Sequence, residues 1–148
     1  MNRFSIPRLA LSASVLILLG VAPRLLADER CSFHSVAGDF GYSVTGTRLP
    51  VGPAASVGIV HFDNQGNLTG SQTLSIGGTI VQGEVLTGTF TVNSDCTGST
   101  TIVVSNTPFP RTSTIDIVWI EDSNAFRAIF TNDGTILVVD GKRLHGGD

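Results

Sequence analysis

The chain has 148 residues, with 9 Lys and Arg against 12 Asp and Glu and a formal net charge of −3. Only one lysine, Lys142, occurs in it. Nucleic-acid binding depends on Lys and Arg that neutralise phosphates, and binding to anionic lipid needs a basic patch, so this composition argues against both kinds of partner.

The first 27 residues have the order of a secretory signal peptide. Arg3 and Arg8 give a positive start, residues 9–22 form an uncharged, mostly apolar run, and the small residue Ala27 precedes Asp28. The apolar run is shorter than the roughly 20 residues that cross a bilayer. We therefore expect cleavage after Ala27, no membrane span in the remaining chain, and a secreted or periplasmic location. The alternative is an uncleaved anchor helix.

Cleavage there would leave residues 28–148 as a single domain. Three of the nine basic residues would leave with the signal peptide and all 12 acidic residues would remain, so this part carries a net charge of −6. About 120 residues lie within the usual range for one domain and suffice for a hydrophobic core.

The cysteines Cys31 and Cys96 are the only two in the chain. In an exported protein an even number of cysteines usually indicates a disulfide. Closing a loop of this length would stabilise the fold by about 4 kcal/mol in the chain-entropy model. A reactive thiol is disfavoured because Asp95 precedes Cys96, and a neighbouring carboxylate opposes thiolate formation.

Alternation with a period of two dominates the chain after a short candidate helix at residues 30–38. Phe40, Tyr42 and Val44 share one side of the first such segment, and serine or threonine occupies most of the other. This pattern is typical of antiparallel strands with one buried and one solvated face. We predict eight strands, at residues 39–47, 56–63, 68–76, 86–92, 99–105, 112–121, 125–131 and 135–140.

Strands that recur every dozen residues, with turn-forming clusters between them, indicate an all-β protein. We predict an antiparallel up-and-down β-barrel of about eight strands, with a β-sandwich as the alternative. Residues 49–56 and 106–111 contain prolines and are expected to be longer connections or lids.

Two of the expected turns share one pattern, "FDNQGNL" at residues 62–68 and "FTNDGTI" at 130–136. Each predicts a three-residue hairpin loop in which Gly66 or Gly134 adopts a left-handed conformation. Asn64 and Asn132 are expected to bond to the turn backbone through their side chains. An EF-hand calcium loop counted from Asp63 does not fit, because positions three, six and twelve carry the wrong residues.

The stretches "GDFGYSVTGT", "HFDNQGNLTG" and "LTGTFTVNSDCTGSTT" together resemble a group of small exported bacterial β-proteins. That group has a Tyr-Gly first strand, a Phe-x-x-x-Gly-Asn hairpin and an Asp-Cys-Thr-Gly turn, and here "FGY" reverses the first of these. The resemblance covers about residues 31–140. It implies a cysteine pair and an eight-stranded sheet, and it implies no activity.

Few residues are candidates for chemistry. His61 and Asp63 are two apart on one strand and so could hold a metal with a third ligand, or simply form a polar edge. Asp116 is either buried with a raised pKa or, as its neighbours Ile115 and Ile117 suggest, exposed. Arg127 shows the same alternation and could pair with Asp116 across two strands.

No nucleophile elbow, phosphate loop or zinc spacing occurs. We therefore predict no catalytic, cofactor-binding or metal-binding residue. The favoured hypothesis is a non-catalytic exported barrel that binds a small apolar ligand or acts at the cell envelope. The alternative is a lipocalin-like barrel enzyme of the cyclase or isomerase type, which a cavity of roughly 300 Å3 or more, with His61, Glu84 or Arg127 pointing inward, would favour.

Overall fold

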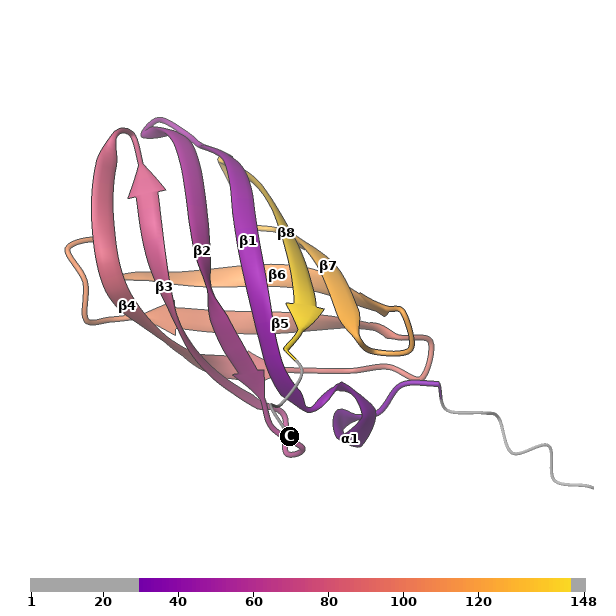
Figure 1. Cartoon of the computed structure of the whole chain (residues 1–148). Coiled ribbons are helices and arrows are strands. Elements are labelled where there is room, and N and C mark those ends of the chain that lie inside the picture. The colour runs from indigo at the N-terminus through magenta and orange to yellow at the C-terminus, as the bar shows by residue number, and fades with distance from the viewer. Residues whose placement is uncertain (1–29, 145–148) are drawn as a thin grey trace, which may run out of the picture.

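The computed structural model describes residues 30–144. The predicted signal peptide and its cleavage site lie outside these residues. Within them, eight strands form one closed antiparallel barrel in which each strand pairs with its neighbours in sequence and β8 pairs with β1 (Figure 1). The predicted up-and-down barrel is confirmed, and the sandwich alternative is not.

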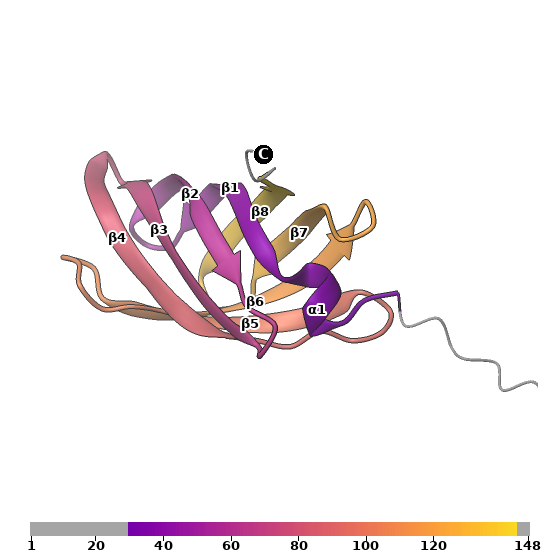
Figure 2. The same cartoon turned by 60° about the horizontal axis from the view of Figure 1, so that its bottom comes forward.

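The elements follow each other without a crossover. A single-turn helix precedes the first strand, where the sequence predicted one, and covers one end of the barrel (Figure 2). The bounds are α1 Phe33–Val36, β1 Gly38–Arg48, β2 Gly52–Phe62, β3 Asn67–Ile76, β4 Thr79–Phe90, β5 Thr97–Val104, β6 Arg111–Ile120, β7 Ala125–Phe130 and β8 Thr135–Arg143.

The expected connection at residues 49–56 is shorter than predicted. Only residues 49–51 turn, and Gly52 already pairs with Arg48 of β1. Ala54 and Ser56 are buried and share the inward face with Val60, so the alternation of β2 runs back to the turn. The prolines misled the prediction because Pro53 lies at the start of the strand, where a missing N–H group is tolerated. The other proline loop, before Arg111, is confirmed.

Aromatic rings fill the barrel near α1. The ring of Phe62 lies 4.9 Å from that of Phe90, 5.6 Å from that of Phe40 and 5.8 Å from that of Phe126, measured between centroids, each in an edge-to-face arrangement. Trp119 packs against the same cluster. Edge-to-face contacts of this kind stabilise beyond the apolar area that they bury, so this end of the barrel is a solid core.

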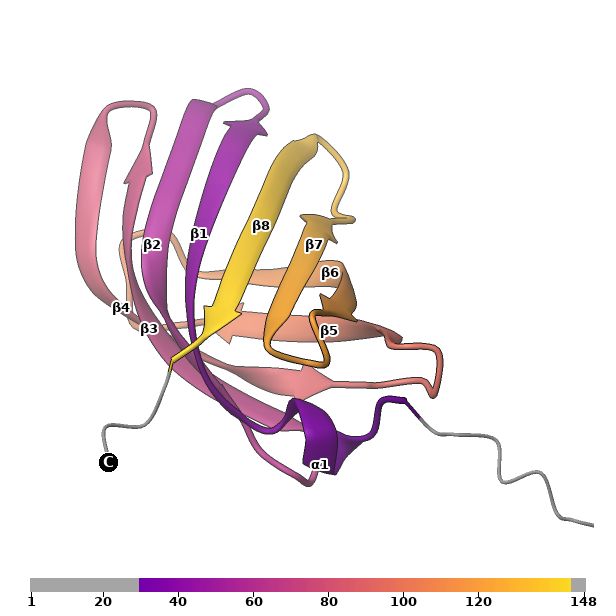
Figure 3. The ribbon, with the colours of Figure 1, turned by 45° about the vertical axis from the view of Figure 1, so that its right-hand side comes forward.

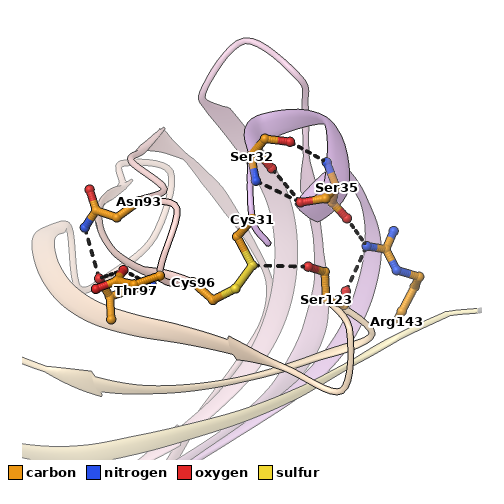
Figure 4. The surroundings of a disulfide bond; sticks show 9 residues. Cys31, Ser32, Ser35, Asn93, Cys96, Thr97, Ser123 and Arg143 are labelled. Atoms are coloured by element: carbon orange, nitrogen blue, oxygen red, sulfur yellow. Dashed lines mark hydrogen bonds between the residues drawn. A yellow bond between two sulfur atoms is a disulfide. The ribbon is translucent and has the colours of Figure 1, made fainter. Parts of the chain in front are cut away.

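The disulfide holds α1 over that core (Figure 4). Cys31, just before the helix, is bonded to Cys96 in the β4–β5 turn, which confirms the predicted pair. Ser32 and Ser35 form a capping box at the start of the helix. From β8, Arg143 donates hydrogen bonds to three backbone carbonyl oxygens, those of Ser35, Ala37 and Ser123. This end of the barrel is therefore sealed by both covalent and polar contacts.

Both predicted glycine turns form, with φ of +89° at Gly66 and +71° at Gly134. The expected role of the asparagines is wrong. In the first turn it is Asp63 whose carboxylate accepts hydrogen bonds from the backbone of Gln65 and from the backbone and side chain of Asn67. Those bonds, led by the one from the Asn67 side chain, hold the pKa of Asp63 below its usual range. In the second turn Asn132 accepts from the backbone N–H of Thr114 on β6, not from its own turn.

Candidate functional site

The end of the barrel opposite α1 is hollow. The β1–β2 and β3–β4 turns lie there, well away from α1 (Figure 3), together with the β5–β6 loop and the β7–β8 turn. The hollow has a volume of about 420 Å3. Leu49, Val51 and Phe109 stand at its rim and are 60, 52 and 38 % exposed. Its apolar walls are formed by Val44, Ala54, Leu74, Ile76, Phe130 and Leu137.

A smaller apolar cavity of about 70 Å3 continues below the hollow. The two share lining residues, among them Val44, Gln72, Arg111 and Ser113. The aromatic core then closes the barrel below. The interior is thus not a solid core, and the hollow at its open end exceeds the roughly 300 Å3 named above as one condition for the enzyme alternative.

A row of polar side chains crosses four strands where the two spaces meet. Tyr42 on β1 is opposite Gly58 on β2, Gly58 is opposite Gln72 on β3, and Gln72 is opposite Glu84 on β4. The Tyr42 hydroxyl donates to Gln72 over 2.9 Å, and the Gln72 amide donates to Glu84 over 2.8 Å. Because Gly58 has no side chain, the Tyr42 hydroxyl passes over β2 to reach the third strand.

Adding a side chain at Gly58 should break this row. A Cβ atom there would lie 2.2 Å from the backbone oxygen of Ser71 and 2.9 Å from the Tyr42 hydroxyl. We expect Gly58→Ala to lower the free energy of unfolding by about 2 kcal/mol, since overpacking against backbone cannot be relieved by rotating a side chain. Urea unfolding measures the effect. Gly41→Ala, on β1 at a position without positive φ where a Cβ would meet only the flexible end of the Leu144 side chain, is a comparison without the backbone clash, and an equal loss in both variants would contradict the packing argument.

The row ends at a gap between β4 and β5. These strands pair only from Thr87 to Phe90, so the first half of β4, which includes Glu84, extends beyond β5. Arg111, the first residue of β6, bridges the gap with two hydrogen bonds of 2.8 and 2.7 Å to the Glu84 carboxylate. Thr107, in the β5–β6 loop, donates a third over 2.6 Å. These contacts tie the loop to the barrel wall.

The Glu84 carboxylate is fully buried and ionised. Burial alone would raise its pKa, but the hydrogen bonds from Arg111, Thr107 and Gln72 and the positive charge of Arg111 outweigh burial and lower the pKa to about 2. Burial also raises the pKa of Tyr42 well above its ordinary value, so the phenol stays protonated and keeps its bond to Gln72. The cluster is a satisfied network and holds no free base.

Sequence analysis named His61, Glu84 and Arg127 as residues that could point inward, and of these only Glu84 points into the barrel. His61 lies outside, where its imidazole is 2.7 Å from Asp39 of β1, and this pair forms an exposed polar edge. Within residues 30–144, no group of three or more His, Cys, Asp or Glu residues could hold a metal ion. The carboxylate of Asp63 accepts hydrogen bonds within the first glycine turn, as described above.

Asp116 is exposed, as its neighbours suggested, but its expected pairing with Arg127 is wrong. In the register of β6 and β7, Arg127 is opposite Val118 and Asp116 is opposite Ile129. The partner of Arg127 is Asp140 of β8, at 3.5 Å and with both side chains largely exposed. The sequence pattern could not distinguish these two neighbours of β7.

Three residues of the polar cluster, Gln72, Thr107 and Arg111, were missed by sequence analysis. For two of them a signal was present. Gln72 is an even number of residues from the inward residues Leu68 and Leu74 of the same strand, and Arg111 is an even number from the inward Ile115. A polar residue at an inward position of a predicted strand is therefore the signal to search for. Thr107 lies in a loop and has no such periodicity.

No protein-family model, no curated protein and no solved structure matches the chain. The resemblance to small exported bacterial β-proteins therefore stays a prediction. In the part of the chain that the structure describes, no helix has the length and apolar character of a membrane span. The disulfide is consistent with an oxidising extracellular or periplasmic compartment.

Proposed function

We propose that this protein is an exported, non-catalytic barrel that binds a small apolar ligand in the hollow at its open end. This proposal rests on the difference between the two ends of the barrel. One is closed by α1, the disulfide and the aromatic core, and the other holds a hollow of about 420 Å3 with mostly apolar walls. Ligand pockets of proteins are typically concave, apolar and a few hundred Å3 in volume, with a few fixed polar groups.

The exposed rim residues support the same proposal. Leu49, Val51 and Phe109 belong to two different turns and all line the hollow. Apolar side chains that gather around a concave site mark a binding surface, whereas single exposed ones need no explanation. A ligand in the hollow would cover these side chains.

The size of the hollow and the inward position of Glu84 meet the condition stated for the enzyme alternative, but the contacts of Glu84 argue against it. Glu84 is the one predicted acid-base candidate inside the barrel, and Arg111, Thr107 and Gln72 occupy both of its oxygens. A general base must be able to reach a substrate proton. An isomerase or cyclase would have to break this network first.

A hollow-filling variant with a matched control tests the proposal. Ala54 lines the hollow, whereas Ser75 on the neighbouring strand β3 is exposed and does not line it. We expect the neutral apolar dye N-phenylnaphthylamine to bind the protein saturably with one site, Ala54→Phe to weaken the dye at least about tenfold, and Ser75→Phe to leave it unchanged. A tenfold change is about 1.4 kcal/mol. Fluorescence titration measures this.

Thermal melting of each variant in the same buffer shows whether it is folded. If the dye does not bind, or binds equally to both phenylalanine variants when both are folded, the hollow is not a ligand site. Val44→Phe, which adds volume to the same hollow from the neighbouring strand β1, serves if Ala54→Phe does not fold.

A further inference from the structure

Two serines that are largely buried have hydroxyl groups that open into the hollow. Ser56 on β2 is 8 % exposed and Ser113 on β6 is 9 % exposed, and both line the hollow. Neither hydroxyl makes a hydrogen bond to another described residue, whereas the Thr100 hydroxyl on β5 donates to a backbone oxygen and the Tyr42 hydroxyl on β1 donates to Gln72. Neither hydroxyl is sealed from solvent, because Trp119 Nε1 is the one buried side-chain polar atom without a partner among the described residues. Both hydroxyls therefore open into the hollow and can bond to water or a ligand there.

The two serines lie on opposite walls. Three strands separate β2 from β6 in either direction around the eight-stranded barrel, so the hydroxyls face each other across the lumen. Gln72 and Arg111 line the same space near its floor. The rim combines the exposed apolar side chains of Leu49, Val51 and Phe109 with the charged Arg48 and Asp133. Hydrogen-bonding groups also lie below it, so a ligand with one polar end should enter with that end first.

The charges around the hollow balance. Arg48, Arg111 and Asp133 line it, and Glu84 lies directly behind Arg111. The guanidinium of Arg111 is already bound by both Glu84 oxygens. An anionic group brought to the floor would meet a second negative charge at close range, and like charges that share a site oppose each other's ionisation.

From these observations we propose that the ligand is an uncharged apolar molecule with one oxygen-containing group, a hydroxyl, ketone or ester, which binds inward against Ser56 or Ser113. This inference rests on the proposed function. With about 420 Å3, the hollow lies within the size range of pockets that bind small molecules. A pure hydrocarbon fits the walls but would strip water from both hydroxyls and replace none of their hydrogen bonds.

Four ligands of similar length separate the possibilities: decanol, octyl acetate, decane and decanoate. Each displaces N-phenylnaphthylamine from the purified, disulfide-bonded protein at neutral pH. We expect decanol and octyl acetate to bind at least about tenfold more tightly than decane and decanoate, because site groups left unpaired by the wrong ligand cost affinity. Ser56→Ala combined with Ser113→Ala should abolish the preference for decanol over decane. Ser75→Ala, on the exposed face of β3, should retain it.

Each outcome decides between the two proposals. If the dye and all four ligands fail to bind, the proposed function itself is wrong. If the dye binds but decane or decanoate equals decanol, or if the double alanine variant keeps the preference, the function stands and the inward oxygen is wrong. If decanoate binds most tightly and Arg48→Gln weakens it, the ligand is an anion held at the rim instead.

Discussion

Replacing Arg111 with methionine should lower the free energy of unfolding by about 3 kcal/mol, because removing one partner of a buried ion pair leaves the other charge uncompensated. Glu84 is fully buried and receives two of its hydrogen bonds from this one guanidinium. The bond from Arg111 to the backbone oxygen of Phe109 is lost as well, so the β5–β6 loop loses a tether. Urea unfolding of both proteins at neutral pH measures the difference.

Two controls make this result specific. Arg127→Met removes an arginine from the exposed pair with Asp140 and should change stability little, since exposed ion pairs contribute little. The double variant Glu84→Leu with Arg111→Met should recover much of the loss, because no unpaired charge remains. If Arg111→Met unfolds at the same urea concentration as Arg127→Met, Glu84 is not held as the structure shows.

The same pair predicts how stability depends on pH. The pKa of Glu84 is lowered from 4.5 to about 2. The unfolded state therefore binds a proton at a higher pH than the native state, so this contribution is fully present above about pH 4.5 and is lost as the pH falls toward 2. The pKa difference corresponds to about 3 kcal/mol. We expect the pH dependence of wild-type stability in this range to be reduced in Glu84→Gln. Identical profiles for the two proteins would contradict the assignment.

Replacing both cysteines with serine should cost about 4 kcal/mol in the chain-entropy model of a loop this long. The bond joins residues 65 apart and holds α1 against the core. A helix of four residues is not stable alone, so without the bond the closed end depends on the Ser32–Ser35 capping box and the contacts of Arg143. Thermal melting of the double variant and of the reduced wild-type protein should agree.

Removing the disulfide should affect the closed end of the barrel and not the open end. The disulfide lies at the closed end and the hollow at the other. At a temperature where the cysteine variant is still folded, we expect it to bind the apolar dye as the wild type does. An unchanged melting temperature would contradict the stabilising role. Loss of dye binding in a folded variant would contradict the separation of the two ends.

The barrel could be predicted from sequence because alternation specifies which side chains are buried in every strand. Phe40, Tyr42 and Val44 are buried as the pattern required. The disulfide and the glycine turns depend on local or compositional signals, which also lie in the sequence. Strand ends were less certain, since Pro53 concealed the first residues of β2.

The polar cluster at the gap between β4 and β5 could not be predicted, because it depends on the pairing of distant strands. Its position follows from β4 extending beyond β5, and from a bulge between Gln72 and Leu74 that shifts the register. Neither is encoded by a local pattern. The pairing of Arg127 failed for the same reason. The alternation of inward and outward positions alone would have placed Gln72, Glu84 and Arg111 inside the barrel. It would not have predicted that they contact each other.

Nuclear magnetic resonance of the amide groups, with decanol added to the purified protein, tests the central claim most directly. We expect saturable shifts at residues that line the hollow on separate strands, such as Ala54, Leu74, Ser113 and Leu137, and little change at Val36 and Trp119 in the closed end. Shifts confined to outward residues such as Val57 and Ile59, or no shifts at concentrations that saturate the dye competition, would contradict a ligand site at the open end of this barrel.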